Sequence, residues 1–225
     1  MPGVTRCRSA SDGVARPLRQ GTGAGHPVRS PPMSTVAVIL AADPGSGFAT
    51  PKYLAPIRGV ALLDRVVADA RTWPVDAIYV VLGADAEQVS DACDFEGVTI
   101  LMDPEWSEGN AAPLRVVLDL LSRDRSIRRA VIARGDQPGV TADVVAALVD
   151  TAVETQSLAA VPKYRYAVGW PVVVGRGVWD VFLGLEGDVS IHDVLVSHSV
   201  TTSEVWVDQL APTAFESAEQ LPATP

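Results

Sequence analysis

Short runs of apolar residues alternate along the chain with segments whose apolar residues recur at helical spacing. An uninterrupted short apolar run is typical of a strand that is covered on both faces. We expect strands at residues 36–40, 78–82, 98–101, 130–133, 159–161, 171–174 and 201–207. Recurrence at i, i+3, i+4 and i+7 predicts helices at residues 61–71, 114–121, 141–150 and 191–196.

This alternation predicts an α/β fold with a mostly parallel central sheet flanked by helices. In open sheets of this kind, ligands bind outside the carboxyl ends of the strands. We therefore look for chemistry in the loop that follows Leu40 and in the loop that follows Ala133.

The charge of the chain is unevenly distributed. The 225 residues carry a formal net charge of −9. Residues 1–32 contain five arginines and one aspartate, which leaves −13 for residues 33–225. With this net charge, residues 33–225 lack the basic surface of a nucleic-acid binder, so we expect no nucleic-acid partner. A polyanionic nucleotide would need a divalent metal to offset the repulsion.

Residues 1–32 are rich in Gly, Pro, Ser and Arg and show no apolar periodicity. We expect either a disordered tail or an extension upstream of the natural start at Met33, with the functional domain at residues 33–225. No apolar run approaches the roughly 18 residues that span a bilayer, which excludes an integral membrane protein. The two cysteines, Cys7 and Cys93, suit a reducing cytosol, so we expect a cytoplasmic protein with no membrane partner.

The loop after the first predicted strand is rich in small residues and ends in a lysine. It reads L-A-A-D-P-G-S-G-F-A-T-P-K from Leu40 to Lys52. Small residues let backbone N–H groups approach a phosphate closely, and the lysine adds positive charge. Taken alone, the loop is equally consistent with an ordinary glycine-rich turn.

A second segment, Arg134-Gly135-Asp136-Gln137-Pro138, follows a buried strand. It places the carboxylate of Asp136 at the end of the sheet, beside a turn that Pro138 makes rigid. Hard oxygen ligands of this kind suit Mg²⁺, which often binds through one or two carboxylates and substrate phosphates. The alternative is an aspartate that caps its own turn.

Together, the two segments resemble the MobA-like nucleotidyltransferases, and among them the molybdenum cofactor cytidylyltransferases. That family opens with L-A-A-G-x-G-x-R-F-G-x-P-K after a strand, and continues with E-G-x-x-x-x-L and G-D-x-P. The matching positions are Leu40, Ala41, Ala42, Gly45, Phe48, Pro51, Lys52, Glu108, Gly109, Leu114, Gly135, Asp136 and Pro138. The resemblance runs from Val36 to about Leu221 and implies a Rossmann-like nucleotidyltransferase fold of the GT-A type.

The resemblance implies a magnesium-assisted transfer of a nucleotidyl group. A phosphorylated small-molecule acceptor, such as a molybdopterin-type cofactor, would attack the α-phosphorus of a nucleoside triphosphate, with CTP favoured. Lys52 and Asp136 would be catalytic, Lys52 on the triphosphate and Asp136 on Mg²⁺. Asp208, or alternatively Asp188, would share the metal. The nucleotide would be bound by Leu40, Ala41, Ala42, Gly45, Gly47, Lys52 and Gly109.

The sequence departs from the family pattern at several positions. Asp43 and Ala49 replace glycines of the phosphate loop, and Gly47 replaces an arginine whose guanidinium would offer paired donors to phosphate. Asp43 would repel a triphosphate if it pointed at it, and would cost little if it only capped its turn. Trp170 replaces a histidine, and a half-buried core aromatic is favoured there over a base contact.

Three hypotheses stay open at this point. An active nucleotidyltransferase with an altered phosphate clamp is favoured. A catalytically impaired relative would bind a nucleotide or a partner without turnover. A transferase for another phosphorylated acceptor is the third, and Lys163 and Arg165 are candidates to contact the acceptor phosphate.

Overall fold

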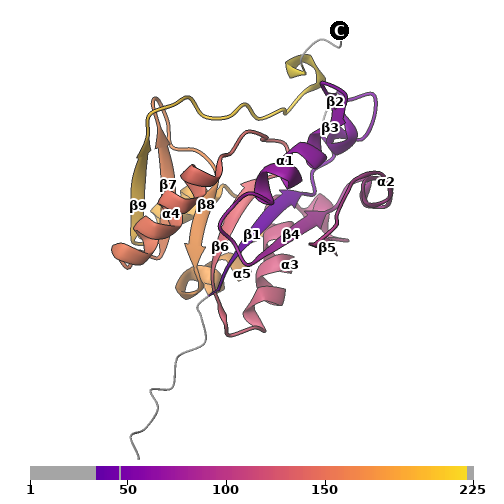
Figure 1. Ribbon diagram of the computed structural model, residues 1–225. Helices are drawn as coiled ribbons and strands as arrows, with labels where there is room; N and C mark the ends of the chain where they lie inside the picture. The colour runs from indigo at the N-terminus through magenta and orange to yellow at the C-terminus, as the bar shows by residue number, and fades with distance from the viewer. Residues whose placement is uncertain (1–33, 46, 222–225) are drawn as a thin grey trace, which may run out of the picture. The chain divides into compact units, whose positions relative to one another are not determined.

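The computed structural model describes residues 34–45 and 47–221, so the expectations for residues 1–32 lie outside the described residues. A seven-stranded sheet forms the centre, in the order β5-β4-β1-β6-β8-β7-β9 (Figure 1). Its strands are β1 (Ser34–Ala41), β4 (Ala77–Leu82), β5 (Val98–Met102), β6 (Ile127–Arg134), β7 (Ala159–Tyr164), β8 (Val172–Gly175) and β9 (Thr202–Val207). A separate hairpin joins β2 (Pro56–Ile57) to β3 (Val60–Ala61).

Helices cover both faces of the sheet (Figure 1). They are α1 (Leu62–Ala70), α2 (Ala86–Ala92), α3 (Ala111–Ser122), α4 (Ala142–Glu154), α5 (Trp179–Leu183) and α6 (Ile191–Ser197). Short 3₁₀ helices occur at η1 (Lys52–Leu54), η2 (Trp106–Glu108), η3 (Arg176–Val178) and η4 (Ala218–Gln220).

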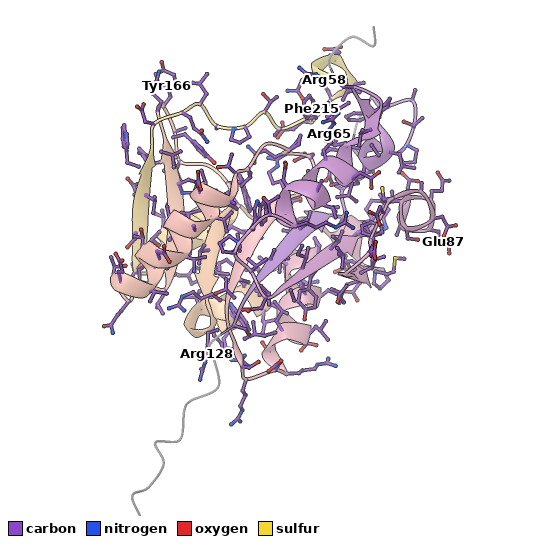
Figure 2. All side chains as sticks on the ribbon, in the orientation of Figure 1. Arg58, Arg65, Glu87, Arg128, Tyr166 and Phe215 are labelled. Carbon is purple, nitrogen blue, oxygen red and sulfur yellow. The ribbon has the colours of Figure 1, made fainter. Side chains whose placement is uncertain are left out.

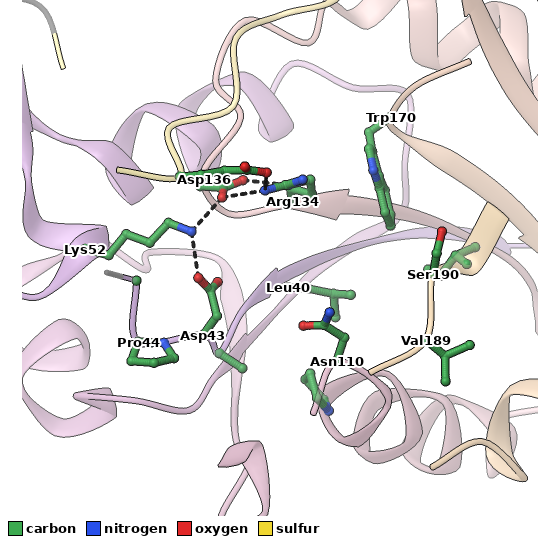
Figure 3. Close-up of a pocket in the computed structure, with 15 residues that line it drawn as sticks. Leu40, Asp43, Pro44, Lys52, Asn110, Arg134, Asp136, Trp170, Val189 and Ser190 are labelled. Atoms are coloured by element: carbon green, nitrogen blue, oxygen red, sulfur yellow. Dashed lines mark hydrogen bonds and ion pairs between the residues drawn. The ribbon is translucent and has the colours of Figure 1, made fainter. Parts of the chain in front are cut away.

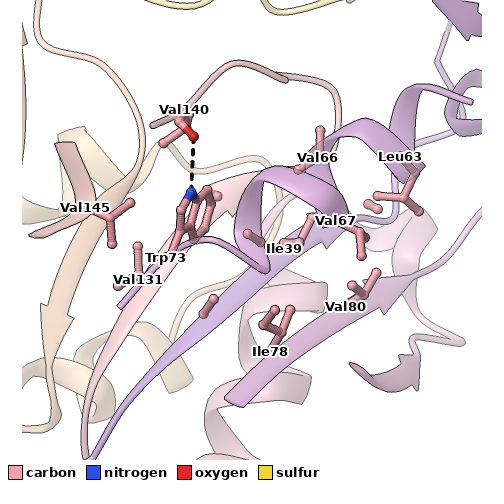
Figure 4. Packing of buried hydrophobic residues seen from close by; sticks show 14 of the residues in the cluster. Ile39, Leu63, Val66, Val67, Trp73, Ile78, Val80, Val131, Val140 and Val145 are labelled. Carbon is pink, nitrogen blue, oxygen red and sulfur yellow. Dashed lines mark hydrogen bonds between the residues drawn. The ribbon is translucent and has the colours of Figure 1, made fainter. Parts of the chain in front are cut away.

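The core has two layers because successive residues of a strand point to opposite faces. From β1, Ala37 and Ile39 join the cluster that includes α1 and α4, part of which Figure 4 shows. Val36 and Val38 join the cluster on the other face, with α3, α5 and α6. Because β1 is buried on both faces, its sequence is an unbroken run of apolar residues.

Parallel pairing brings the ends of β1 and β6 together. In the register of these strands, Leu40 lies opposite Arg134, and the Gly135 N–H donates to the Leu40 carbonyl at 2.8 Å. Position 135 has no room for a side chain, because a Cβ would lie 2.7 Å from the Cβ of Ala41. β8 is antiparallel to β6 and β7 and begins at the edge where β6 ends. The predicted mostly parallel sheet is confirmed, and this edge carries the site.

The predicted strands and helices are present, with ends displaced by a few residues. The apolar pattern predicts neither α2 nor α5. In α2 the one buried residue is Val89, so no apolar stripe marks this helix in the sequence. Exposed side chains such as Glu87 and Arg128 project outward (Figure 2). Within the described residues, no helix is long and apolar enough to cross a membrane.

Candidate active site

A cavity of about 590 Å³ opens at the edge of the sheet where β1 and β6 end (Figure 3). Its charged end is lined by Asp43, Lys52, Arg134, Asp136 and Glu216. Its mainly apolar end is lined by Leu40, Pro113, Trp170, Val189 and Ile191. A cavity of this size is in the range that holds small-molecule ligands. It lies at the strand ends where the sequence predicts chemistry.

The ammonium group of Lys52 lies between two carboxylates. Its Nζ donates to Asp43 Oδ2 at 2.7 Å and to Asp136 Oδ2 at 2.6 Å, and 3% of the lysine side chain is exposed. Gly45 makes room for the lysine stem, because a Cβ there would lie 2.7 Å from Lys52 Cδ. The φ of Gly45, +65°, also favours glycine. The structure therefore brings the two predicted catalytic residues, Lys52 and Asp136, into direct contact.

Two cations hold the carboxylate of Asp136. In addition to Lys52, Arg134 donates from Nε to Oδ1 and from Nη2 to Oδ2, both at 2.8 Å. Burial opposes ionisation of Asp136, but the Arg134 hydrogen bonds and the Lys52 charge outweigh it, so the pKa of Asp136 lies below its usual value. Asp136 is therefore ionised at neutral pH, and its oxygens bind side chains rather than its own turn.

Asp43, which replaces a glycine of the family pattern, faces the cavity. Its Oδ1 accepts a hydrogen bond from the Tyr53 hydroxyl, and its Oδ2 accepts one from Lys52. Burial and the nearby Asp43 charge raise the pKa of Tyr53, so the phenol stays protonated and donates. Asp43 thus neither caps its turn nor stands unpaired in the cavity, because Lys52 balances its charge.

Two charged residues of the cavity, Arg134 and Glu216, are not predicted as site residues from the sequence. Arg134, the last residue of β6, binds Glu216 Oε1 through Nη2 at 2.8 Å, in addition to Asp136. Glu216 belongs to the segment that returns from β9 to the end of β6, where the Phe215 N–H donates to the Asp136 carbonyl at 2.9 Å. The place of Arg134 beside Asp136 at a strand end is a signal that could identify it. Glu216 has no such local signal.

The structure does not bring Asp208 to Asp136, which corrects the prediction of a shared metal ligand. Asp208 follows β9, and β8 and β7 separate that strand from β6. The Asp208 side chain is 82% exposed and pairs with Arg165 at 2.8 Å. Lys163, the other candidate for an acceptor contact, lies 3.9 Å from Glu204 on the same edge of the sheet. These residues form surface ion pairs away from the cavity.

Of the predicted nucleotide-binding residues, the lining of the cavity includes Leu40, Ala42, Gly45 and Lys52, with Ala41 fully buried. Gly47 is exposed and lies outside this lining. Gly109 has a φ of +117° and packs against Gly187, whose carbonyl carbon would lie 2.4 Å from a Cβ at position 109. Asp188, the alternative metal ligand, accepts a hydrogen bond from the Asn110 N–H at 3.1 Å. Gly109 and Asp188 thus pack at the start of α3 and lie outside the lining of the cavity.

The sequence matches the family model described as MobA-like NTP transferase domain over residues 37–202. Among curated proteins, the chain is similar to the bifunctional protein GlmU of Azotobacter vinelandii, at 34% identity over 115 residues. GlmU of Burkholderia ambifaria is 36% identical over 119 residues. These matches cover 50% and 52% of this chain, but only 24% and 25% of the two relatives.

Solved structures share the fold over most of the described residues. The homologue of Rv0371c from Mycobacterium sp. strain JC1 has a TM-score of 0.75 and 28% identity, covering 84% of this chain and 93% of that chain. Mycobacterium tuberculosis Rv0371c in complex with manganese has a TM-score of 0.70 and 26% identity, covering 83% and 95%. The fold is also similar to that of the CMP:2-keto-3-deoxy-manno-octonic acid synthetase complexed with CTP, with a TM-score of 0.66. That match covers 83% of this chain and 94% of the synthetase chain, and at 14% identity it shows a likeness of fold alone.

Proposed function

The chain belongs to the MobA-like NTP transferase domain family, and on this premise we propose that it transfers a nucleotidyl group from an NTP to a phosphorylated acceptor. An oxygen of the acceptor phosphate forms a bond to the α-phosphorus. The bond from that phosphorus to the oxygen bridging to the β-phosphate breaks, and its electron pair leaves with pyrophosphate. The observation that carries the proposal is the 2.6 Å contact of Lys52 with Asp136 at one cavity.

Mg²⁺ is the cofactor that we propose. The carboxylates of Asp43 and Asp136 are the hard oxygen donors that Mg²⁺ prefers, and they already hold one cation, the Lys52 ammonium. Asp136 would hold the metal, with Asp43 in the role predicted for Asp208. The described residues contain no cluster of three or more His, Cys, Asp or Glu able to hold a metal, so substrate phosphates would supply further ligands. The ion would neutralise phosphate charge, and the manganese complex of Rv0371c supports a divalent cation.

Lys52 and Arg134 would stabilise the phosphate charge. Arg134 presents a guanidinium to the cavity from β6, whereas the arginine of the family's loop is replaced by Gly47. The two cations face three carboxylates, Asp43, Asp136 and Glu216, so the charged end carries one net negative charge. A triphosphate would therefore bind with a divalent cation, or after one carboxylate has moved away.

CTP as the nucleotide, and a molybdopterin-type cofactor as the acceptor, are proposed on the resemblance to molybdenum cofactor cytidylyltransferases. One alternative is that the chain acts on another phosphorylated acceptor. A second alternative, favoured by the altered phosphate loop, is that the chain binds a nucleotide without turnover. A cytoplasmic location without nucleic-acid or membrane partners is proposed on the acidic composition and the two cysteines.

The test is a titration of the full chain with CTP, GTP, ATP and UTP, with and without Mg²⁺, while thermal unfolding is followed. A nucleotide at a hundred times its dissociation constant should raise the free energy of unfolding by about 2.7 kcal/mol. We expect this with CTP and only with Mg²⁺ present. No stabilisation by any of the four at millimolar concentration would contradict the proposed function.

Gly47→Arg should tighten the binding of Mg·CTP about tenfold, because it restores paired donors to phosphate. In the part of the chain that the structure describes, no atom lies within 4 Å of a Cβ at position 47, so the side chain has room there. The φ of +75° should cost about 1 kcal/mol of stability, which Gly47→Ala measures separately. Calorimetric titration gives both affinities. If the arginine variant binds no more tightly than the alanine variant, the loop does not follow the triphosphate.

Glu216→Gln should tighten the binding of Mg·CTP by about 1 kcal/mol, or roughly fivefold, because it frees Arg134 from a half-exposed ion pair and removes one negative charge. The effect should weaken with added salt. Glu219→Gln, three residues further on, is the matched control and should leave the affinity unchanged. Equal affinities of the two variants would show that Glu216 does not oppose the nucleotide.

A further inference from the structure

Trp170 forms a wall of the apolar end of the cavity, and the chemistry proposed for the charged end does not use it. Its carbonyl accepts a hydrogen bond from the Tyr164 hydroxyl at 2.8 Å. The ring of His192 meets the indole edge to face, with centroids 5.4 Å apart at 88°. His192 is itself fixed, because its Nε2 donates to the Gly169 carbonyl at 3.1 Å. These contacts fix the backbone at Trp170 and place the His192 ring against its indole.

The side chains around the indole form a surface suited to the flat face of a ligand ring. Val189 and Ile191 line the same end of the cavity, and Ser190 adds a hydroxyl. Indole and aliphatic side chains together bind flat apolar surface, and a nearby polar group orients it. A side chain fixed in advance loses little conformational freedom when a ligand stacks on it.

Trp170 and the loop that follows β1 (the β1 loop) lie on opposite sides of the charged groups of the cavity. Figure 3 shows Lys52 and Asp43 on one side of the cavity, Asp136 and Arg134 in the middle, and Trp170 on the other side. In a nucleotidyl transfer, the attacking and leaving oxygens stand roughly in line on opposite sides of the phosphorus. If Lys52 and the β1 loop hold the leaving pyrophosphate, the attacking acceptor approaches from the side of Trp170.

We propose that Trp170 is a specificity-determining residue for the acceptor, which is a phosphate monoester that carries a ring. The ring, a planar heterocycle or a sugar, lies against the indole, and the phosphate of the acceptor reaches Arg134. This inference rests on the proposed function and deepens it, because it names the class of the second substrate. Stacking tolerates many rings, so the indole selects for a ring rather than for one compound.

The test compares the wild-type chain with two variants. Trp170→Phe keeps an aromatic ring at this position, and Trp170→Leu replaces it with an aliphatic side chain. Three phosphate monoesters are titrated by calorimetry: riboflavin 5′-phosphate with a planar ring, glucose 1-phosphate with a sugar ring, and glycerol 3-phosphate with none. The wild type and Trp170→Phe should bind at least one ring-bearing probe about tenfold more tightly than glycerol 3-phosphate. Trp170→Leu should lose that advantage. Mg·CTP should bind all three proteins alike.

Three results would overturn the inference. The first is a wild type that binds the ring-bearing probes no more tightly than glycerol 3-phosphate, and the second is a Trp170→Leu variant that retains their full affinity. A parallel loss of Mg·CTP affinity in Trp170→Leu would instead assign the indole to the nucleobase. If Trp170→Leu does not fold, His192→Ala replaces it, because loss of the edge-to-face contact should weaken ring binding alone. Absence of Mg·CTP binding to the wild type contradicts the proposed function, whereas the probe titrations still decide the role of Trp170.

Discussion

Asp136→Asn should remove most of the magnesium-dependent part of the stabilisation by CTP. The substitution keeps the shape of the side chain but removes the charge that Lys52 and Arg134 both bind. Mg²⁺ prefers ionised carboxylates, and an amide in the place of Asp136 would leave the ion with Asp43 and the phosphates. Loss of one group that stabilises charge in a transition state commonly lowers the rate about a hundredfold to a thousandfold. We therefore expect a similar drop in pyrophosphate release once an acceptor is supplied.

The matched control is Asp208→Asn. Asp208 is exposed and pairs with Arg165 on the far edge of the sheet, so its replacement should leave the magnesium-dependent stabilisation intact. Thermal unfolding with CTP, with and without Mg²⁺, measures both variants. An undiminished magnesium effect in Asp136→Asn would remove Asp136 from the role of metal ligand.

The same variant gives a signature in the pH dependence of stability. The pKa of Asp136 is lowered in the folded chain, so ionised Asp136 stabilises the fold at pH values above its unfolded pKa of about 3.9. This contribution is lost as the pH falls through the lower, folded value. Wild type and Asp136→Asn should therefore differ most at neutral pH and converge in strong acid, which urea unfolding at several pH values can follow.

Lys52→Met should be the most destabilising single substitution in the cavity, at about 3 kcal/mol. Methionine keeps the apolar stem that packs beneath Gly45, but it removes the ammonium that balances Asp43 and Asp136. Asp136 keeps its bonds to Arg134, and Asp43 is 45% exposed, so we expect the lower end of the range for a broken buried ion pair. Urea unfolding at neutral pH measures the loss.

Lys163→Met is the control for Lys52→Met, because Lys163 is about one-third exposed and lies 3.9 Å from its carboxylate partner, Glu204. It should change the free energy of unfolding by less than about 1 kcal/mol. Adding Asp43→Asn to Lys52→Met should restore part of the lost stability, since it removes one of the two charges left without the ammonium. Equal losses in the two lysine variants would show that the contacts of Lys52 do not stabilise the fold.

Much of this fold can be predicted from the sequence because its signals are local. The apolar runs of β1, β4 and β6 and the stripe of α3 depend on neighbouring residues within one element. The short α2 buries Val89 alone and therefore leaves no such pattern. The placement of Lys52 and Asp136 at one site is also predictable, because the ends of parallel strands meet at one edge and the family pattern puts both residues there. Their direct contact is not predicted, because the family pattern assigns one to phosphate and the other to the metal.

The remaining contacts of the site depend on the path of the chain through space. Asp208 lies at the end of a predicted strand, as Asp136 does, but the order of the strands places two strands, β8 and β7, between β9 and β6. Glu216 reaches Arg134 because the segment after β9 crosses back and pairs Phe215 with Asp136. The sequence by itself determined the sheet, its flanking helices and the placement of Lys52 and Asp136 at one site. Only the tertiary structure decided which other carboxylates face the cavity and that Trp170 forms its far wall, because both follow from contacts between residues far apart in the chain.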